Sequence, residues 1–101
     1  MSEIKKEDIE LVSRLITAIN QTELAEDFIL DFFSNSEISD LAERWQIAEL
    51  VSKGTPQRQV RDELKVSLAK VSRSAQILKS ERKSFVKVEQ LLKRENEKEP
   101  H

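Results

Sequence analysis

Glycine occurs only once in this chain of 101 residues, at Gly54, and this scarcity restricts the folds that the chain can adopt. Tight hairpins and phosphate-binding loops need residues that accept a positive φ angle without strain, and glycine is the usual one. Residues that favour helices, such as Leu, Glu, Lys and Gln, are abundant instead. We therefore expect an all-α fold, with one small domain over residues 1–94 and a polar, disordered tail over residues 95–101.

Apolar spacing and capping residues divide the domain into six predicted helices. Ser34 and Glu37 match the capping box of a helix start, and Gly54 matches the position just after a helix end. Thr55 and Pro56 match an N-cap followed by the first helical residue. The predicted helices cover about residues 6–20, 23–33, 35–53, 56–64, 68–79 and 84–94.

Residues 56–79 have the spacing of a helix-turn-helix motif, in which two helices meet at a steep angle. Val66 is placed to pack at the corner, Val71 to hold the second helix, and Ser67 to cap that helix. Lys65 stands in the turn, where most such motifs carry glycine. Since a left-handed backbone costs a lysine on the order of 1 kcal/mol, the sequence predicts the motif with a strained turn.

The net charge of −2 is unevenly distributed along the chain. Residues 1–52 carry four basic and twelve acidic side chains, whereas residues 53–83 carry nine basic and three acidic ones. Residues 84–101 carry four of each sign. A basic segment on an acidic scaffold is typical of a module that binds a polyanion, although a solvated helix face rich in lysine has the same composition.

The helix-turn-helix segment offers side chains of the types that contact DNA. If its second helix enters a major groove, the first turns present apolar and hydrogen-bonding groups to base edges. Arg58 can bond both acceptors of a guanine, whereas most of the other cations suit phosphates. Any one Lys or Arg taken alone is also explained as a solvated charge. The predicted contacts with double-stranded DNA are Gln57, Arg58, Arg61, Leu68, Ala69, Lys70, Ser72, Arg73 and Lys79.

Several function classes lack the residues that they need. Cysteine and tyrosine are absent and the single histidine is His101, so thiolate metal sites and acid–base catalysis by an internal histidine have no side chains to use. No apolar run approaches the roughly 20 residues of a membrane span, and the charged N-terminus does not match a signal peptide. We expect a cytoplasmic protein that is not an enzyme, holds no metal and does not enter membranes.

The first two predicted helices are more apolar than two small surface helices require. In the second of them, Leu24, Phe28, Ile29, Phe32 and Phe33 lie at helical spacing. Apolar faces of this extent usually mark interfaces. We therefore expect a second copy of the chain to cover them in a homodimer.

Residues 34–79 resemble the Trp repressor family, including its branch of Trp-repressor-like proteins. The resemblance rests on the segment LAERWQIAEL around Arg44, the break at Gly54, the QR pair and the VSR segment that ends at Arg73. These features follow in the family's order, with one residue fewer between Gly54 and Gln57. The resemblance implies six-helix subunits in an intertwined dimer, whose recognition helices reach a near-palindromic operator about one DNA turn, roughly 34 Å, apart.

Members of this family bind free tryptophan as a corepressor between the core and the recognition helix. The resemblance places Arg44 and Arg73 on either side of that ligand and backbone carbonyls near Ser34 on its ammonium group. Ser74 replaces a glycine beneath the indole, and Ile77 replaces a serine that contacts the ligand. Because Ser74 narrows the slot and Ile77 removes a polar partner, L-tryptophan as an amino-acid effector and a pocket without it both remain open.

The sequence thus favours a DNA-binding transcription regulator that represses by occluding a promoter. Two alternatives remain. One is a Trp-repressor-like regulator that binds no tryptophan, in which Arg44 forms a structural ion pair with Asp40 or Glu43. The other is a helical adaptor whose basic motif binds an acidic protein.

Overall fold

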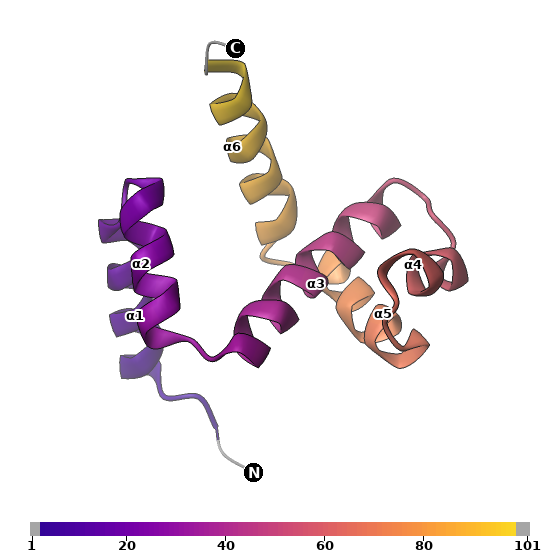
Figure 1. Cartoon of the computed structure of the whole chain (residues 1–101), viewed down its shortest axis with the longest axis horizontal. Helices are drawn as coiled ribbons and strands as arrows, with labels where there is room; N and C mark the ends of the chain where they lie inside the picture. Colours follow the sequence, from indigo (N-terminus) through magenta and orange to yellow (C-terminus); the bar gives the residue numbers. More distant parts are fainter. Residues whose placement is uncertain (1–2, 99–101) are drawn as a thin grey trace. The chain divides into compact units, whose positions relative to one another are not determined.

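The computed structural model describes residues 3–98, and every regular element within them is a helix (Figure 1). The all-α prediction is thus confirmed. The chain divides between Ile38 and Ser39 into two compact units. No helix in the described part is both long and apolar enough to span a membrane. The elements in chain order are α1 (Lys6–Ala18), α2 (Thr22–Phe32), α3 (Asn35–Ser52), α4 (Gln57–Leu64), α5 (Leu68–Ala75), the 3-10 turn η1 (Gln76–Lys79) and α6 (Ser84–Lys98).

The first unit contains α1, α2 and the first turn of α3, and its apolar side chains are largely uncovered. No residue of α1 or α2 is buried. Phe28 stacks on Phe32 with ring centroids 4.6 Å apart, yet 73% of Phe32 is exposed. An uncovered apolar face of this kind usually marks an interface. The exposed apolar residues of α1 are Ile9, Leu11, Val12, Leu15 and Ile16.

The second unit is organised around three side chains that solvent does not reach. Ile47 from α3, Val60 from α4 and Val71 from α5 pack together, so each of these helices contributes one anchor. Burying an aliphatic side chain of this size contributes about 1.5–3 kcal/mol. This small cluster therefore holds α4 and α5 against α3. Four partly buried side chains surround it, Leu50, Val51, Leu64 and Val66.

An aromatic contact joins α6 to α3 in the same unit. The rings of Trp45 and Phe85 lie 4.7 Å apart at 40° to each other, and only 5% of Phe85 is exposed. Such a tilted pair adds about 0.5–1.5 kcal/mol to the energy of burying its apolar area. The start of α6 is therefore fixed on the middle of α3.

The start of α3 has the capping box that the sequence predicts. The Ser34 hydroxyl accepts a hydrogen bond from the backbone N–H of Glu37 at 3.2 Å. In return, the backbone N–H of Ser34 donates to the Glu37 carboxylate at 2.8 Å. Both bonds satisfy N–H groups that have no partner within the helix, so the prediction is confirmed.

The connection from α3 to α4 differs from the prediction by one residue. Gly54 follows the helix with φ +92°, as a glycine after a helix end commonly does. Pro56, however, is the N-cap of α4, and Thr55 is not. With φ −59° and ψ 143°, Pro56 is extended, and its carbonyl accepts the N–H of Val60 at 3.1 Å. Thr55 instead belongs to the end of α3, because its N–H donates to the Leu50 carbonyl at 3.1 Å.

The turn between α4 and α5 has the strained residue that the sequence predicts. Lys65 adopts the left-handed conformation, with φ 56° and ψ 47°. The N–H of the next residue, Val66, donates to the Arg61 carbonyl at 3.2 Å and closes the turn. Ser67 then caps α5 by accepting the N–H of Lys70 at 3.0 Å. The helix-turn-helix spacing and the Ser67 cap are confirmed.

Three helix ends differ by two or more residues from those expected. α1 ends at Ala18, and the segment predicted as one helix over 68–79 ends as an α-helix at Ala75 and continues as η1. Such 3-10 turns are common at helix C-termini. α6 continues to Lys98, so residues 95–98 are helical and the predicted tail is wrong there. Residues 95–98 contain neither glycine nor proline, so nothing in that segment breaks the helix. The remainder of the predicted tail, residues 99–101, lies outside the described residues.

We predict that Lys65→Gly stabilises the chain by about 1 kcal/mol, because glycine adopts the left-handed turn without the steric cost of a Cβ atom. Chemical denaturation followed by circular dichroism measures the change. Lys65→Ala is the matched control: it also removes the charge but keeps the Cβ atom, and we expect it to leave the stability unchanged. Equal stabilisation by both variants would show that charge, and not backbone strain, sets the cost of this turn.

Candidate functional site

The outer face of α4 and α5 carries most of the predicted DNA contacts. The same two helices turn Val60 and Val71 into the core, so their opposite sides are open to solvent. Arg61 is partly exposed at the end of α4, and Lys79 is exposed in η1. The fold thus gathers these side chains on neighbouring helices. The exposed members on α4 and α5 are Gln57, Arg58, Leu68, Ala69, Ser72 and Arg73.

A hydrogen bond connects the two helices across this face. The hydroxyl of Ser72 donates to the side-chain carbonyl of Gln57 at 2.9 Å. The amide nitrogen of Gln57 and the lone pairs of the Ser72 oxygen stay available to a further partner. Two of the predicted DNA contacts therefore orient each other before any partner binds.

Most of the basic side chains in residues 53–83 have no acidic partner within residues 3–98. Among the described residues, only Arg61 and Lys70 of the nine form ion pairs. Arg61 bonds its neighbour Asp62 at 2.9 Å, and this bond raises the pKa of Arg61. The uncompensated charge favours binding to a polyanion. The seven cations without an ion pair to a described residue are Lys53, Arg58, Lys65, Arg73, Lys79, Arg82 and Lys83.

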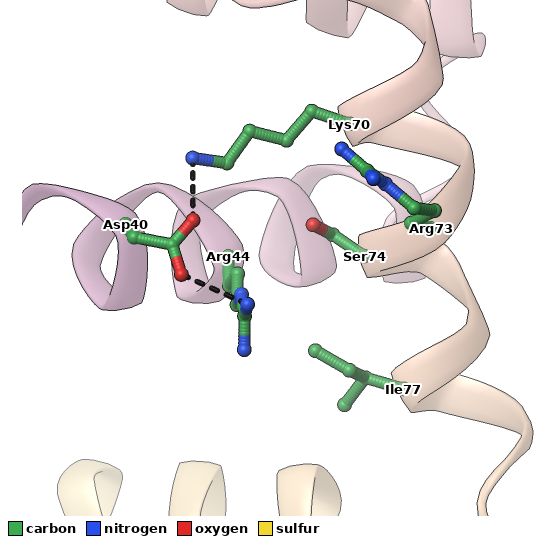
Figure 2. Close-up of a pocket in the computed structure, with 6 residues that line it drawn as sticks. All are labelled: Asp40, Arg44, Lys70, Arg73, Ser74 and Ile77. Carbon is green, nitrogen blue, oxygen red and sulfur yellow. Dashed lines mark ion pairs between the residues drawn. The ribbon is translucent and has the colours of Figure 1, made fainter. Parts of the chain in front are cut away.

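A pocket of about 310 Å³ lies between α3 and the segment formed by α5 and η1 (Figure 2). Four of the residues predicted to hold a ligand line it, one from α3 and three from the segment formed by α5 and η1. Two residues that the ligand prediction omits, Asp40 and Lys70, line it as well. The four predicted ligand residues that line the pocket are Arg44, Arg73, Ser74 and Ile77.

Two of the predicted ligand residues have surroundings that bear on binding. Ser74 is only 5% exposed, so its hydroxymethyl group is part of the packed wall. Ser34 is not among the residues that line this pocket, and its hydroxyl is engaged in the capping box of α3. The structure therefore brings Arg44, Arg73, Ser74 and Ile77 together but does not add Ser34 to them.

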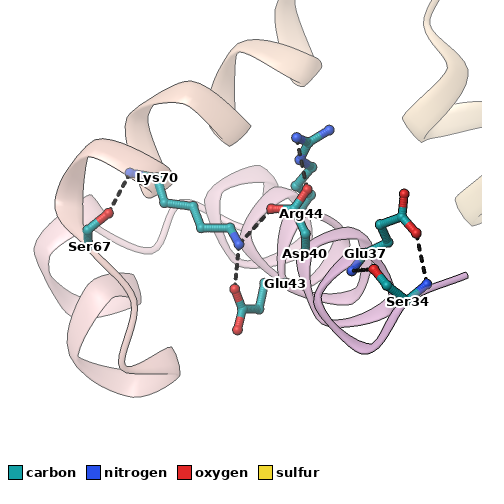
Figure 3. Close-up of polar contacts among 7 residues, drawn as sticks. All are labelled: Ser34, Glu37, Asp40, Glu43, Arg44, Ser67 and Lys70. Carbon is teal, nitrogen blue, oxygen red and sulfur yellow. Dashed lines mark hydrogen bonds and ion pairs between the residues drawn. The ribbon is translucent and has the colours of Figure 1, made fainter.

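An ion cluster that includes three lining residues of this pocket joins α5 to α3 (Figure 3). The ammonium group of Lys70 donates to Asp40 at 2.8 Å and also to the carboxylate of Glu43. Asp40 also accepts from the guanidinium of Arg44 at 2.9 Å. Lys70 is only 20% exposed, which makes it the least exposed member. The sequence predicts Lys70 as a DNA contact, whereas in the structure its ammonium group is bonded to two carboxylates of α3.

The contacts within this cluster shift two pKa values in opposite directions. The hydrogen bond from Lys70 holds the pKa of Asp40 below its usual value, and the charge of Arg44 acts in the same direction. The hydrogen bonds to Asp40 and Glu43 raise the pKa of Lys70. The contribution of Asp40 to stability is lost as the pH falls through its lowered pKa, and that of Lys70 as the pH rises through its raised pKa. Both contributions are present at neutral pH.

Asp40 and Glu43 are the site residues that the ligand and DNA predictions omit. The spacing of Asp40 and Arg44 on one helix suggests their pairing, because residues four apart face each other. No comparable signal connects either carboxylate with Lys70, since Glu43 and Lys70 are 27 residues apart. Only the packing of α5 on α3 brings them together.

Comparison with known proteins gives one match. The model of the family described as Trp repressor protein matches residues 7–96, which is most of the chain. No curated protein and no solved structure matches it. The family match extends beyond the helix-turn-helix segment to α1, α2 and α6.

Proposed function

Because the chain belongs to the Trp repressor family, we propose that it is a cytoplasmic transcription regulator that binds a specific double-stranded operator and represses by occluding a promoter. The observation that most supports this function is the open face of α4 and α5, which combines uncompensated cations with small and apolar groups on α5. A major groove accommodates one such helix, and its base edges accept these groups.

Arg58 and Lys83 suit different roles in this complex. Arg58 is exposed in the first turn of α4, beside the Gln57–Ser72 bond that joins the two helices. A guanidinium at that place can bond both acceptors of a guanine. Lys83 lies outside the motif, directly before α6, and is exposed. A lysine away from the base-reading helices suits a phosphate.

We predict that Arg58→Ala relaxes base preference at one position, whereas Lys83→Ala weakens binding to every duplex alike. The expected loss of discrimination for Arg58→Ala is about 1–3 kcal/mol at that base pair. Lys83→Ala should make the dependence of log affinity on log salt shallower by about one. Fluorescence anisotropy on duplexes that differ at single base pairs, at several salt concentrations, measures both. Salt-insensitive binding that neither variant alters would contradict DNA recognition and favour an acidic protein partner.

We infer that the uncovered face of α1 and α2 pairs with a second copy of the chain. No residue of either helix is buried, and 71% of Leu30 and 73% of Phe32 in α2 are exposed. A symmetric dimer covers the same face on both subunits. It would also present two copies of α5 to the two halves of a palindrome.

We expect sedimentation equilibrium to give twice the chain mass of 11.7 kDa. Phe32→Glu places a charge on the proposed interface and should shift the protein towards the monomer, because an unpaired charge is costly to bury. Leu68→Glu is the matched control, since Leu68 is an exposed apolar residue of α5. A monomeric wild-type chain at micromolar concentration, or equal dissociation of both variants, would contradict the dimer.

We further propose that the pocket between α3 and α5 does not hold L-tryptophan. Ser74 already fills part of its wall, and Ile77 offers no polar group to an amino-acid head. Asp40 occupies a donor of Arg44 at 2.9 Å and brings a negative charge next to the place where a ligand carboxylate would bind. This regulator would accordingly need no tryptophan to act.

We predict no heat of binding when L-tryptophan is titrated into the chain at millimolar concentration. Isothermal titration calorimetry measures this, and DNA binding by the same preparation verifies that the protein is folded. A saturable heat with a dissociation constant below 1 mM would overturn the proposal of an empty pocket, without affecting the proposal of DNA binding.

A further inference from the structure

The ion cluster is attached to the part of α5 that is proposed to enter DNA. Lys70 lies in the first turn of that helix, and its backbone N–H is bonded to the Ser67 cap. Its side chain reaches across to Asp40 and Glu43 on α3 (Figure 3). Both ends of Lys70 are therefore held, one on the helix start and one on the core helix. The exposed residues Leu68 and Ala69 precede it directly.

The position of Lys70 on α5 separates it from the reading face. Residues four apart lie on the same side of a helix, so Lys70 shares a side with Ser74, and both line the pocket. Leu68 and Ser72 share another side, which is exposed. Lys70 thus faces α3, while the groups suited to bases face solvent.

The charges in the cluster compensate one another. Lys70 and Arg44 supply two positive charges, and Asp40 and Glu43 supply two negative ones. To reach a phosphate, Lys70 would have to leave two hydrogen-bonded carboxylates behind. A phosphate contact by Lys70 is therefore less favourable than one by the cations that have no ion pair among the described residues.

We propose that Lys70 is a positioning residue, which holds α5 in its DNA-reading orientation by joining it to Asp40 and Glu43, with no effector bound. The inference rests on the proposed function. The buried residues of α5 are Val71, Ser74 and Ala75, so packing holds the helix from Val71 onward. The three residues before Val71 contribute no buried side chain, which leaves the start of the helix without a core anchor. The ion cluster supplies an anchor there, because it bonds Lys70 to Asp40 and Glu43 and so fixes the start of α5 on α3.

A network of this kind is favourable where an isolated surface pair is not. An exposed pair gains little, because ordering two long side chains opposes the attraction. Here the Lys70 ammonium satisfies two carboxylates with a single ordered side chain, and Asp40 is already bonded to Arg44. The entropy of ordering Lys70 is thus lost once for two bonds.

Substitution of Asp40 and Glu43 shows whether Lys70 positions α5 or contacts DNA directly. The two roles predict changes of opposite sign in the affinity for DNA. Asp40→Ala/Glu43→Ala frees Lys70 and removes two negative charges. If Lys70 bound phosphate itself, affinity would rise. We expect affinity for the duplex that the wild-type chain binds most tightly to fall about fivefold or more, as typical couplings between sites do. Glu49→Gln is the control, since it removes a charge elsewhere on α3 and should not lower the affinity for that duplex.

Substitution of the lysine gives a second, independent readout. Lys70→Met keeps the length of the side chain and removes its charge. It should lower the affinity for DNA without changing the slope of log affinity against log salt. Loss of a phosphate contact would instead make that slope shallower by about one. Lys70→Arg retains a charged donor and should restore binding. Lys70→Met should also raise the pKa of Asp40, measured by carboxyl NMR, and Lys79→Met should not.

Amide hydrogen exchange in the absence of DNA distinguishes failure of this inference from failure of DNA binding. In the Asp40→Ala/Glu43→Ala variant, the amides of α5 should exchange several-fold faster, whereas those of α1 should not change. Unchanged exchange in α5, or equal or tighter duplex binding by this variant, would overturn the positioning role. Faster exchange in α5 of this variant, together with a wild-type chain that binds no duplex, would overturn DNA binding alone.

Discussion

The packing of Val71 against Ile47 and Val60 is the interaction on which the proposed site depends. It is the contact that sets α5 on α3 and α4, and it does so with three side chains that solvent does not reach. Because consecutive residues of a helix point about 100° apart, fixing Val71 inward also fixes its neighbours. Lys70 then faces the carboxylates of α3, and Ser72 faces solvent. Together with Ser74 and Ala75, the other buried residues of α5, this valine separates a side that faces the pocket from a side that faces solvent.

The basic residues of the 53–83 segment fall into two groups in the fold, those without an ion pair to a described residue and those with one. Most basic residues of the 53–83 segment have no acidic partner among the described residues, and they account for its attraction to polyanions. Lys70 belongs to the second group, because acidic residues of α3 compensate its charge. Asp40 and Glu43 therefore act within the site and are more than part of a solvated helix face. This distinction explains why neighbouring cations on α5 can have different roles.

Local signals made much of the fold predictable, and long-range contacts limited the rest. Ser34 with Glu37 and the strained Lys65 were predictable because each depends on residues only a few positions apart. The pairing of Lys70 with Glu43 was not, since it spans 27 residues and arises from packing. The Thr55 cap failed because the backbone of Thr55 is held by the end of α3. Likewise, four helical residues after residue 94 carried no local stop signal.

The proposal of a dimeric regulator that binds DNA without tryptophan can be tested by selecting duplexes from a random-sequence library with the purified chain in the absence of tryptophan. We expect enrichment of a near-palindrome whose half-sites are centred about one DNA turn, roughly 10 base pairs, apart. Such a sequence would reflect both the reading face of α5 and the pairing of two subunits. A pool that stays unenriched at low and at physiological salt would contradict DNA recognition, and one that becomes enriched only when tryptophan is added would contradict binding without an effector.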